Sequence, residues 1–450
     1  MKALRPIAQF LTTTEIFLAG AAVGAVFVTD RALLPALIAL ALYWPIRWLA
    51  HGRPSVRTPV DWPLLFLVAV MVPVTLWATA LPDLTQPQVM RFGAGIGFLY
   101  AMINWANRVD RLRWLLRGLL AAGAGLAAVA PFIVLWGGRK FPLIPQSIYT
   151  FFTTRVTDIV NPNVMGGTLA LLIPVALALL LLGGKRVKWV DKGLALVSLI
   201  GMAGILVLTQ SRGALMGTAA AGLVILLMAG RWGQVLAAVG SVGILGFLFT
   251  GGSELLFDAA TTDATFGGLE QRVEIWSRAI YMVQDFSFTG VGMGSFGRVA
   301  DLLYPFFLAP PGQIPHAHNL YLQVAVDLGI PGLLAWLAVL FTVMVAAWQV
   351  YRSGRRHAHG SYRTALGAGL LASQTALMVH GLTDATVWGM TKPAVVVWAV
   401  WGLTLAAHRV YVGDPERAAA LDQAVAAIEH DDPSLTPGWA EQPELTASAP

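Results

Sequence analysis

Apolar residues recur along this chain in blocks of about 20, separated by short polar segments. At about 1.5 Å per residue, each block is long enough to cross roughly 30 Å of hydrocarbon as a helix. The pattern predicts an all-α integral membrane protein with about 12 transmembrane helices. These lie near residues 8–29, 31–50, 61–80, 88–106, 112–136, 164–183, 190–208, 213–229, 232–250, 318–350, 364–387 and 393–411.

Longer polar interruptions divide the chain into four parts. We expect nine spans in residues 1–250, an outer loop in 251–317, three further spans in 318–411 and a tail in 412–450. The outer loop is too long for a simple turn and contains an amphipathic stretch, so it predicts a lid of short helices over the membrane domain. The tail is rich in Ala, Glu and Asp and then in Pro, Ser and Thr, which is typical of a mobile segment.

The composition agrees with a membrane protein and excludes several other classes. Apolar residues make up 57% of the 450 residues and charged residues 12%, whereas a soluble domain carries about twice that share of charge. A cytosolic enzyme and a disordered protein are therefore excluded. Because the chain has no cysteine, disulfides, thiolate nucleophiles and cysteine-ligated metals are excluded as well.

The positive charge orients the spans. The formal charge of +6 could suggest a nucleic-acid partner, but in a membrane protein the placement of the cations is more informative. Twenty of the 30 Lys and Arg residues fall on one side of the predicted spans and ten on the other. This bias places both termini in the cytoplasm and predicts no nucleic-acid partner. The second span follows the first almost at once, so we expect a retained helical hairpin rather than a cleaved signal peptide.

Arg212 is an outer cation that the charge bias does not explain. It lies in Ser211-Arg-Gly213, at a tight outer turn between two apolar spans. An arginine here could extend its guanidinium to lipid headgroups, or it could bind an anion in a cavity. Since other groups that bind oxyanions accompany it, we favour the anion ligand.

Arg272 is a second such cation, on the amphipathic stretch of the outer loop. Read as a helix, this stretch puts Arg272 on one face with Ile275, Trp276 and Ala279. Arg272 therefore points toward the membrane domain. Glu274 and Arg278 lie four residues apart and can form an ordinary solvated pair.

His316 and His318 lie where the outer loop re-enters the membrane. A histidine there can act as a general base near pH 7. On a helix the two side chains would diverge by about 200°, so we expect no zinc pair and no bound metal. One histidine is predicted to be catalytic and the other positional.

Two further patterns have alternative readings. Gly292-Met-Gly-Ser-Phe-Gly297 matches a dinucleotide-binding motif, but it follows no buried strand, and we expect a flexible turn whose N–H groups could approach an anion. His380 and Asp384 are four residues apart on the eleventh span. They could form a proton relay in a transporter or a polar contact between helices.

The motifs together resemble the O-antigen ligase and polymerase superfamily over roughly residues 150–390. The most specific of them is His318-Asn319, followed after nine residues by Gly329-Ile-Pro-Gly332. The accompanying motifs, in the order typical of that family, are Asn161-Pro-Asn163, Ser211-Arg-Gly213, Arg272-x-x-Ile-Trp276 and Gly290-Val-Gly-Met-Gly294.

The resemblance implies a glycosyltransferase that needs no metal or other cofactor. Such enzymes transfer a glycan from undecaprenyl diphosphate to an acceptor hydroxyl at the periplasmic face of the bacterial inner membrane. The acceptor is the lipid A core in ligases, which we favour, and another lipid-linked glycan in polymerases. Membrane lipids are the other expected partners.

The residue types fit that chemistry. Guanidinium groups match phosphate oxygens, so Arg212 and Arg272 are expected to bind the diphosphate, and His318 to take the acceptor proton. Asn319, Tyr321, His316 and Asn161 are expected to orient substrates. A solute or anion transporter is the alternative from another class, although a carrier's site is expected near the midplane. A passive export scaffold would leave the outer arginines unexplained.

Overall fold

The computed structural model describes residues 4–136, 145–151, 159–185, 187–247, 249–250, 269–356, 361–385, 388 and 394–413. Within these ranges the secondary structure is helical, apart from one isolated bridge between Val134 and Val160. Residues 414–450 of the predicted tail and 251–268 of the predicted outer loop lie outside the described residues.

The helices follow the predicted spans closely. They are α1 (Arg5–Val28), α2 (Leu33–His51), α3 (Asp61–Phe66), α4 (Val72–Ala78), α5 (Pro82–Trp105), α6 (Val109–Ile133), α7 (Gln146–Phe151), α8 (Pro162–Leu182), α9 (Trp189–Thr209), α10 (Arg212–Met228), α11 (Arg231–Phe247), α13 (Leu269–Asp285), α14 (Phe296–Leu303), α15 (Leu320–Arg356), α16 (Ser361–Gly381) and α17 (Ala394–Tyr411), with short turns η2 (Asp30–Ala32) and η3 (Leu67–Met71).

Eight helical segments among the described residues are long and apolar enough to cross a membrane, and α10 is a shorter apolar helix. An all-α membrane protein is therefore confirmed. Each of the 12 predicted spans coincides with a helix or, for 61–80, with α3, η3 and α4 in sequence. The number of helices that actually cross the bilayer stays a prediction.

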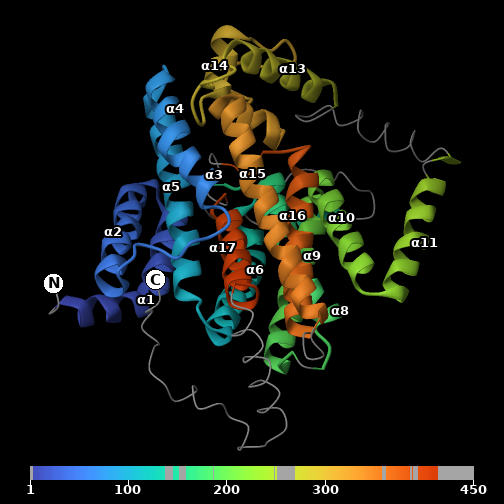
Figure 1. Ribbon diagram of the computed structural model, residues 1–450. Coiled ribbons are helices and arrows are strands. Elements are labelled where there is room, and N and C mark those ends of the chain that lie inside the picture. Colours follow the sequence, from blue (N-terminus) through green and yellow to red (C-terminus); the bar gives the residue numbers. More distant parts are fainter. Residues whose placement is uncertain are drawn as a thin grey trace, which may run out of the picture.

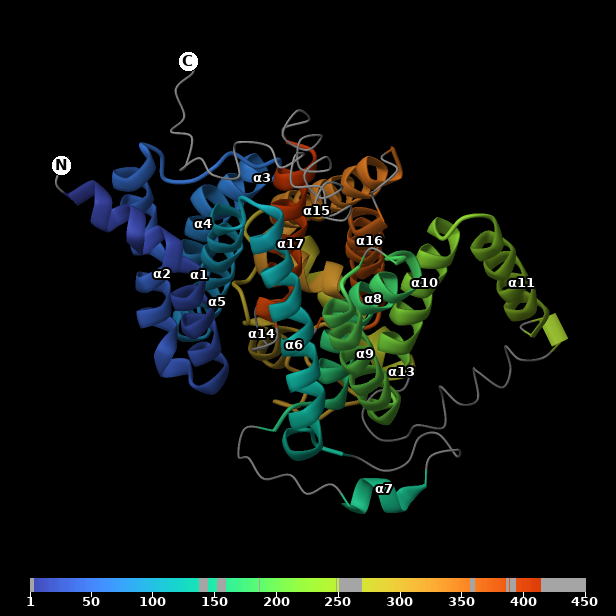
Figure 2. The same ribbon diagram turned by 90° about the horizontal axis from the view of Figure 1, so that it is seen from below.

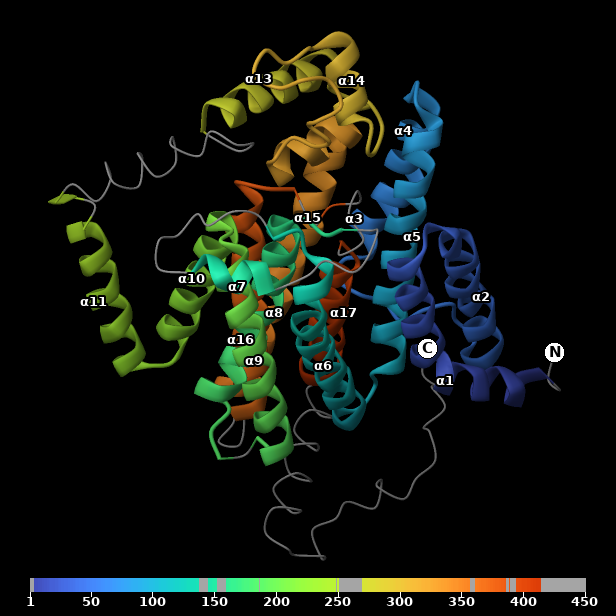
Figure 3. The same ribbon diagram turned by 180° about the vertical axis from the view of Figure 1, so that it is seen from behind.

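The degree of burial separates central helices from peripheral ones. The most apolar 18-residue stretches of α17 and α8 are 89% and 78% buried inside the protein, whereas that of α1 is 28% buried. Figures 1 and 2 show the α1–α2 hairpin at one edge of the bundle and α11 at the other, with α8, α15, α16 and α17 between them. Figure 3 shows the bundle from behind, with α6 and α9 on the side that faces away from the viewer in Figure 1. The exposed apolar faces of the outer helices suit contact with lipid.

α15 is interrupted near its beginning, contrary to the single span predicted there. Gly329 has φ 73° and ψ 178°, which are not helical angles. A Cβ at this position would lie 2.7 Å from the Phe288 carbonyl carbon, so glycine is required. Residues 320–328 thus form a short helix ahead of the long one, and Pro331 begins the next turn without needing an N–H donor.

The glycine run 290–294 caps this interruption. Gly290, Gly292 and Gly294 all have positive φ. The N–H of Val291 donates to the Val326 carbonyl at 2.8 Å, and that of Gly292 to the Asp327 carbonyl at 3.3 Å. The run therefore satisfies carbonyls that the interrupted helix leaves without partners. The prediction that its N–H groups approach an anion is wrong for these two donors.

α13 and α14 lie across one end of the bundle (Figure 1). They have a hydrophobic core of their own, which includes Ile275, Met282, Phe296 and Ile314. Val326 of the short helix joins the same cluster, and α13 packs against α15. We refer to residues 269–319 as the lid. At the opposite end of the bundle, α1 begins and α17 ends.

Candidate active site

Four segments meet where the lid contacts the bundle. They are the N-terminus of α10, the inner face of α13, the loop 315–319 that precedes α15, and the turn 382–385 that follows α16. The charged or polar side chains that they contribute are, in the same order, Arg212, Arg272, His316 with His318, and Asp384. The site therefore joins segments that are far apart in the chain.

Arg272 anchors the lid to the bundle. Its Nη1 donates to the Thr383 carbonyl at 2.7 Å. The face predicted from the helical spacing is correct, because Ile275 and Ala279 are buried. Burial lowers the pKa of the Arg272 guanidinium; the positive charge of Arg212 lowers it further, and the carboxylate of Asp384 opposes both. Arg212 and Arg272 are thus close enough to repel one another.

Arg212 is the first residue of α10, where close helix packing fixes its position. A Cβ on Gly213 would lie 2.0 Å from the Thr383 hydroxyl oxygen, and one on Gly166 would lie 3.0 Å from the Ser211 Cβ. Only glycine allows α10 to approach α8 and the turn after α16 this closely. Arg212 itself is half-buried. Together with the partial positive charge of the helix N-terminus, the two guanidinium groups favour an anion between them.

The two histidines lie in a bent loop and not on a helix. His318 has φ 46°, in the left-handed region, and its N–H donates to His316 Nδ1 at 3.2 Å. The ring centroids are 4.1 Å apart. The prediction that the side chains diverge was wrong because it assumed helical geometry, whereas α15 begins only at Leu320.

Asp384 faces both histidines. Its Oδ1 lies 3.7 Å from His318 Nδ1 and 3.9 Å from His316 Nδ1. His318 Nδ1 is buried and makes no hydrogen bond among the described residues. Catalytic contacts of this length in a ligand-free site commonly shorten when substrate binds. The geometry resembles a histidine oriented by a carboxylate, which leaves Nε2 as the basic nitrogen.

Charges in the site follow from burial and from these contacts. Burial lowers the pKa of His316 to about 4, and His318 and Arg272 contribute to the decrease against the effect of Asp384. Burial alone would raise the pKa of Asp384, but His318, His316 and His380 outweigh it and hold that pKa below its usual value. At neutral pH the site therefore contains an ionised Asp384 beside a neutral His316.

His316, His318 and Asp384 could together hold a metal ion, since one donor atom from each lies within 4.8 Å of the others. The reason for expecting no zinc pair was therefore wrong. However, two guanidinium groups border the same cluster, and their charge disfavours a divalent cation. The absence of a metal remains a prediction that an assay can test.

Asn319 fixes the start of α15. Its Oδ1 accepts from the N–H groups of Tyr321 and Leu322, at 3.0 Å each, and its Nδ2 donates to the Leu382 carbonyl at 3.1 Å. This cap holds the loop that carries His318 against the turn that carries Asp384. Asn319 therefore has a positional function in the fold, while its contact with substrate stays a prediction.

Tyr321 and Asn161 also have structural partners. The Tyr321 hydroxyl donates to the Met378 carbonyl at 3.0 Å, so it joins α15 to α16. The Asn161 side chain accepts from the Asn163 N–H at 2.8 Å and caps α8, ahead of Pro162. Neither contact supports or excludes the predicted role in orienting substrates.

The sequence did not assign Asp384 to this site. The four-residue spacing suggested a side-chain pair with His380, but the Asp384 N–H donates to the His380 carbonyl at 3.0 Å and the carboxylate turns toward the loop. A usable signal was present, because the order of spans puts residue 384 and His318 on the same side of the membrane.

One comparison with known proteins found a match. Residues 197–337 match the family model described as O-antigen ligase, and no curated protein matches the chain. The matched range includes Arg212, Arg272, His316 and His318. Asp384 lies beyond its end.

Proposed function

Because the chain carries a domain of the O-antigen ligase superfamily, we propose that it is a membrane glycosyltransferase of that type. It transfers a glycan from undecaprenyl diphosphate to a hydroxyl of the lipid A core, with inversion, at the periplasmic face of the bacterial inner membrane. The observation that carries this proposal is the turn 383–384, where Thr383 binds Arg272 and Asp384 faces His318. One turn thus joins the cations to the base.

Arg212 and Arg272 bind the diphosphate of the donor. The leaving diphosphate develops negative charge as the glycosidic bond breaks, and preorganised guanidinium groups in a buried site stabilise that charge. A bound anion offsets the repulsion between the two guanidinium groups. In this role the arginines replace the divalent metal of many sugar-nucleotide enzymes.

His318 deprotonates the acceptor. The acceptor oxygen attacks the anomeric carbon as its proton moves to His318 Nε2, and the bond between that carbon and the diphosphate oxygen breaks with its electrons. The products are the glycosylated acceptor, undecaprenyl diphosphate and a protonated His318. Asp384 stabilises the imidazolium and holds Nδ1 toward itself, as a positioning residue.

The first test is His318→Ala in purified full-length protein. We expect release of undecaprenyl diphosphate from a lipid-linked glycan, on addition of lipid A core, to fall by about 10²- to 10⁴-fold. His51→Ala, at the exposed end of α2, is the matched control and should retain wild-type activity. Each assay is run with and without EDTA, because we propose a metal-independent reaction.

Three results would contradict the proposal. Wild-type activity in His318→Ala would exclude the base assignment, and loss of activity with EDTA would favour a metal at His316, His318 and Asp384. A wild-type protein that releases no undecaprenyl diphosphate would favour the transporter or the scaffold instead.

The acceptor is tested in cells. If the protein is a ligase, deletion of its gene should leave lipid A core without polymer while lipid-linked polymer accumulates. A gel of surface glycans measures this. A surface glycan of one repeat per core would instead identify an O-antigen polymerase, which is our alternative within the same superfamily.

A further inference from the structure

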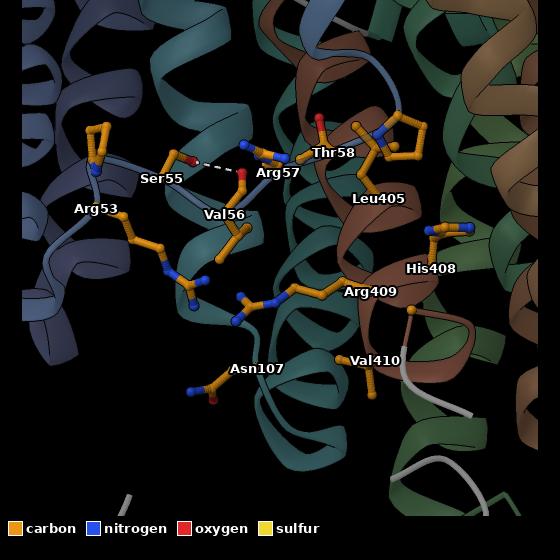
Figure 4. Close-up of a pocket in the computed structure, with 13 residues that line it drawn as sticks. Arg53, Ser55, Val56, Arg57, Thr58, Asn107, Leu405, His408, Arg409 and Val410 are labelled. Atoms are coloured by element: carbon orange, nitrogen blue, oxygen red, sulfur yellow. Dashed lines mark hydrogen bonds between the residues drawn. The ribbon is translucent and has the colours of Figure 1, made fainter. Parts of the chain in front are cut away.

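A cavity of about 880 Å³ lies at the end of the bundle opposite the lid. Figure 4 shows its lining, which comes from three places. These are the segment 53–59 after α2, Asn107 in the turn between α5 and α6, and the last turns of α17 with Gly413. The proposed active site does not include any of these residues.

The cavity is strongly cationic. Arg53, Arg57 and Arg409 line it, and no Asp or Glu from the part of the chain that the structure describes does. Arg53 and Arg57 form no salt bridge with a carboxylate of the described residues. In Figure 4 the guanidinium groups of Arg53 and Arg409 turn toward one another. Three cations with no carboxylate among them favour an anionic ligand.

The nearest acidic residue along the segment is already engaged. The Asp61 carboxylate accepts from the Thr58 N–H at 2.9 Å, from the Thr58 hydroxyl at 2.5 Å and from the Tyr100 hydroxyl at 2.6 Å. It is therefore oriented toward Thr58 and Tyr100 and does not neutralise Arg57.

The segment that carries Arg53 and Arg57 is held in place before any ligand arrives. The Val56 N–H donates to Asn104 Oδ1 at 3.1 Å, and Asn104 Nδ2 donates to the Ser55 hydroxyl at 2.9 Å. Arg47 Nη1 donates to the Pro54 carbonyl at 3.1 Å. Fixing this backbone in advance lowers the entropy that ligand binding would cost.

Arg409 is fixed as well. Its Nη1 donates to the Ile103 carbonyl at 2.7 Å, which holds the guanidinium at the junction of α5 and α17. The guanidinium is planar and lines the cavity. Its fork suits the two oxygens of a phosphate.

The remaining lining is mixed. Val56, Leu405 and Val410 are apolar, whereas Ser55, Thr58, Asn107 and His408 are polar. Two large exposed aromatic residues, Trp48 and Trp62, flank the segment on α2 and α3. Tryptophan is enriched where a membrane meets water, so these two residues favour a cavity near lipid headgroups. The apolar side chains among the cationic and polar ones suit an amphipathic ligand better than a free ion.

We propose that this cavity binds a phosphate-bearing anion, with the headgroup of an anionic phospholipid as the source that the lining favours. Basic pockets between transmembrane helices on the cytoplasmic side commonly take such headgroups. The site is independent of the proposed glycosyl transfer, and it ties α2, α5 and α17 together at the end of the bundle opposite the lid.

The test is native mass spectrometry of the purified full-length chain titrated with dioleoylphosphatidylglycerol, with dioleoylphosphatidylcholine or with inorganic phosphate. We expect one phosphatidylglycerol to bind saturably and phosphatidylcholine to bind far more weakly. Each of Arg53→Gln and Arg57→Gln should weaken phosphatidylglycerol binding by about fivefold. Arg355→Gln, an exposed arginine at the same end of the bundle on α15, is the control and should leave binding unchanged.

The three ligands and the variants distinguish the possible outcomes. Inorganic phosphate could bind as tightly as phosphatidylglycerol and lose that binding in the same two variants. That result would keep the phosphate site but assign it to a free anion. Equal affinity of both variants and the control for phosphatidylglycerol would overturn the proposal. Binding that is seen only after deletion of residues 414–450, which carry eight acidic residues and one basic residue, would also overturn it, because the chain's own tail would then occupy the cavity.

Discussion

Among single residues, the two arginines differ in how they are held, and this difference bears on their chemistry. Arg272 already uses one Nη1 donor on the Thr383 carbonyl, whereas Arg212 begins a helix whose N-terminal charge adds to its own. In the proposed mechanism both present forked donors to the diphosphate. A lysine keeps the charge at either position but loses the fork.

We therefore expect Arg212→Lys and Arg272→Lys each to lower glycan transfer by about 10- to 100-fold. The measurement is release of undecaprenyl diphosphate at saturating acceptor. Arg278→Lys is the matched control on α13, because Arg278 donates to the Pro305 carbonyl and pairs with Glu274. Full activity in both site variants would argue against bidentate binding of the diphosphate.

His316 gives the fold a dependence on pH. Its pKa in the folded protein is about 4, below the value of about 6.5 expected in an unfolded chain. Between these values the unfolded chain binds a proton that the folded protein excludes. Acidification from about pH 6.5 to pH 4 therefore favours unfolding, by at most about 1.4 kcal/mol per pH unit for this one group.

His316→Gln should flatten the fall in melting temperature between pH 6.5 and pH 4, because glutamine does not titrate and its amide oxygen can still accept the His318 N–H. Thermal unfolding in detergent measures this. His51→Gln, at the end of α2, should keep the wild-type slope. An unchanged slope in His316→Gln would mean that another group dominates the acid sensitivity.

Among the secondary-structure elements, the contact between α10 and the turn after α16 positions Arg212 relative to Arg272. A Cβ on Gly213 would meet the Thr383 hydroxyl at 2.0 Å and His380 Nδ1 at 3.2 Å. Gly222 lies on the same helix, and a Cβ there meets nothing within 4 Å. The helix thus provides its own control.

We expect Gly213→Ala to lower glycan transfer by between about 10- and 100-fold, because it displaces α10 and misplaces the arginine. Gly222→Ala should retain wild-type activity. Removing the clashing hydroxyl in Gly213→Ala/Thr383→Ala should restore part of the loss. Equal activity of the two single variants would show that this contact does not set the position of Arg212.

The elements were largely predictable from the sequence, because apolar block length is a local property. The interruption of α15 was harder to predict, although Gly329 and Pro331 lie at it. Helical spacing correctly placed Arg272 toward the bundle, but the same assumption failed for the histidines, which precede the helix. Asp384 reaches them only through the folding together of distant segments, and no local pattern encodes that contact.

For the whole molecule, the orientation in the membrane is the prediction that most affects the function, because the lid and its site must face the periplasm. The chain has no cysteine, so a single introduced cysteine reports its own location without background labelling. Gln313 in the lid and Arg355 at the far end of α15 are both exposed.

A membrane-impermeant maleimide should label Gln313→Cys in intact spheroplasts. It should label Arg355→Cys only after the inner membrane is permeabilised, because the charge bias places that end in the cytoplasm. The cysteine-free parent is the control and should remain unlabelled in both conditions. Labelling in the reverse pattern would invert the topology and exclude a periplasmic active site.

Arg272 belongs to the lid and Arg212 to the bundle, so a diphosphate bound by both connects two parts of the molecule. By linkage, donor binding strengthens the contact between lid and bundle by the same factor by which that contact strengthens donor binding. The proposed product, undecaprenyl diphosphate, keeps both phosphates and carries one more ionisable oxygen than the proposed donor. Departure of the spent lipid carrier, rather than glycosyl transfer itself, is therefore expected to limit turnover.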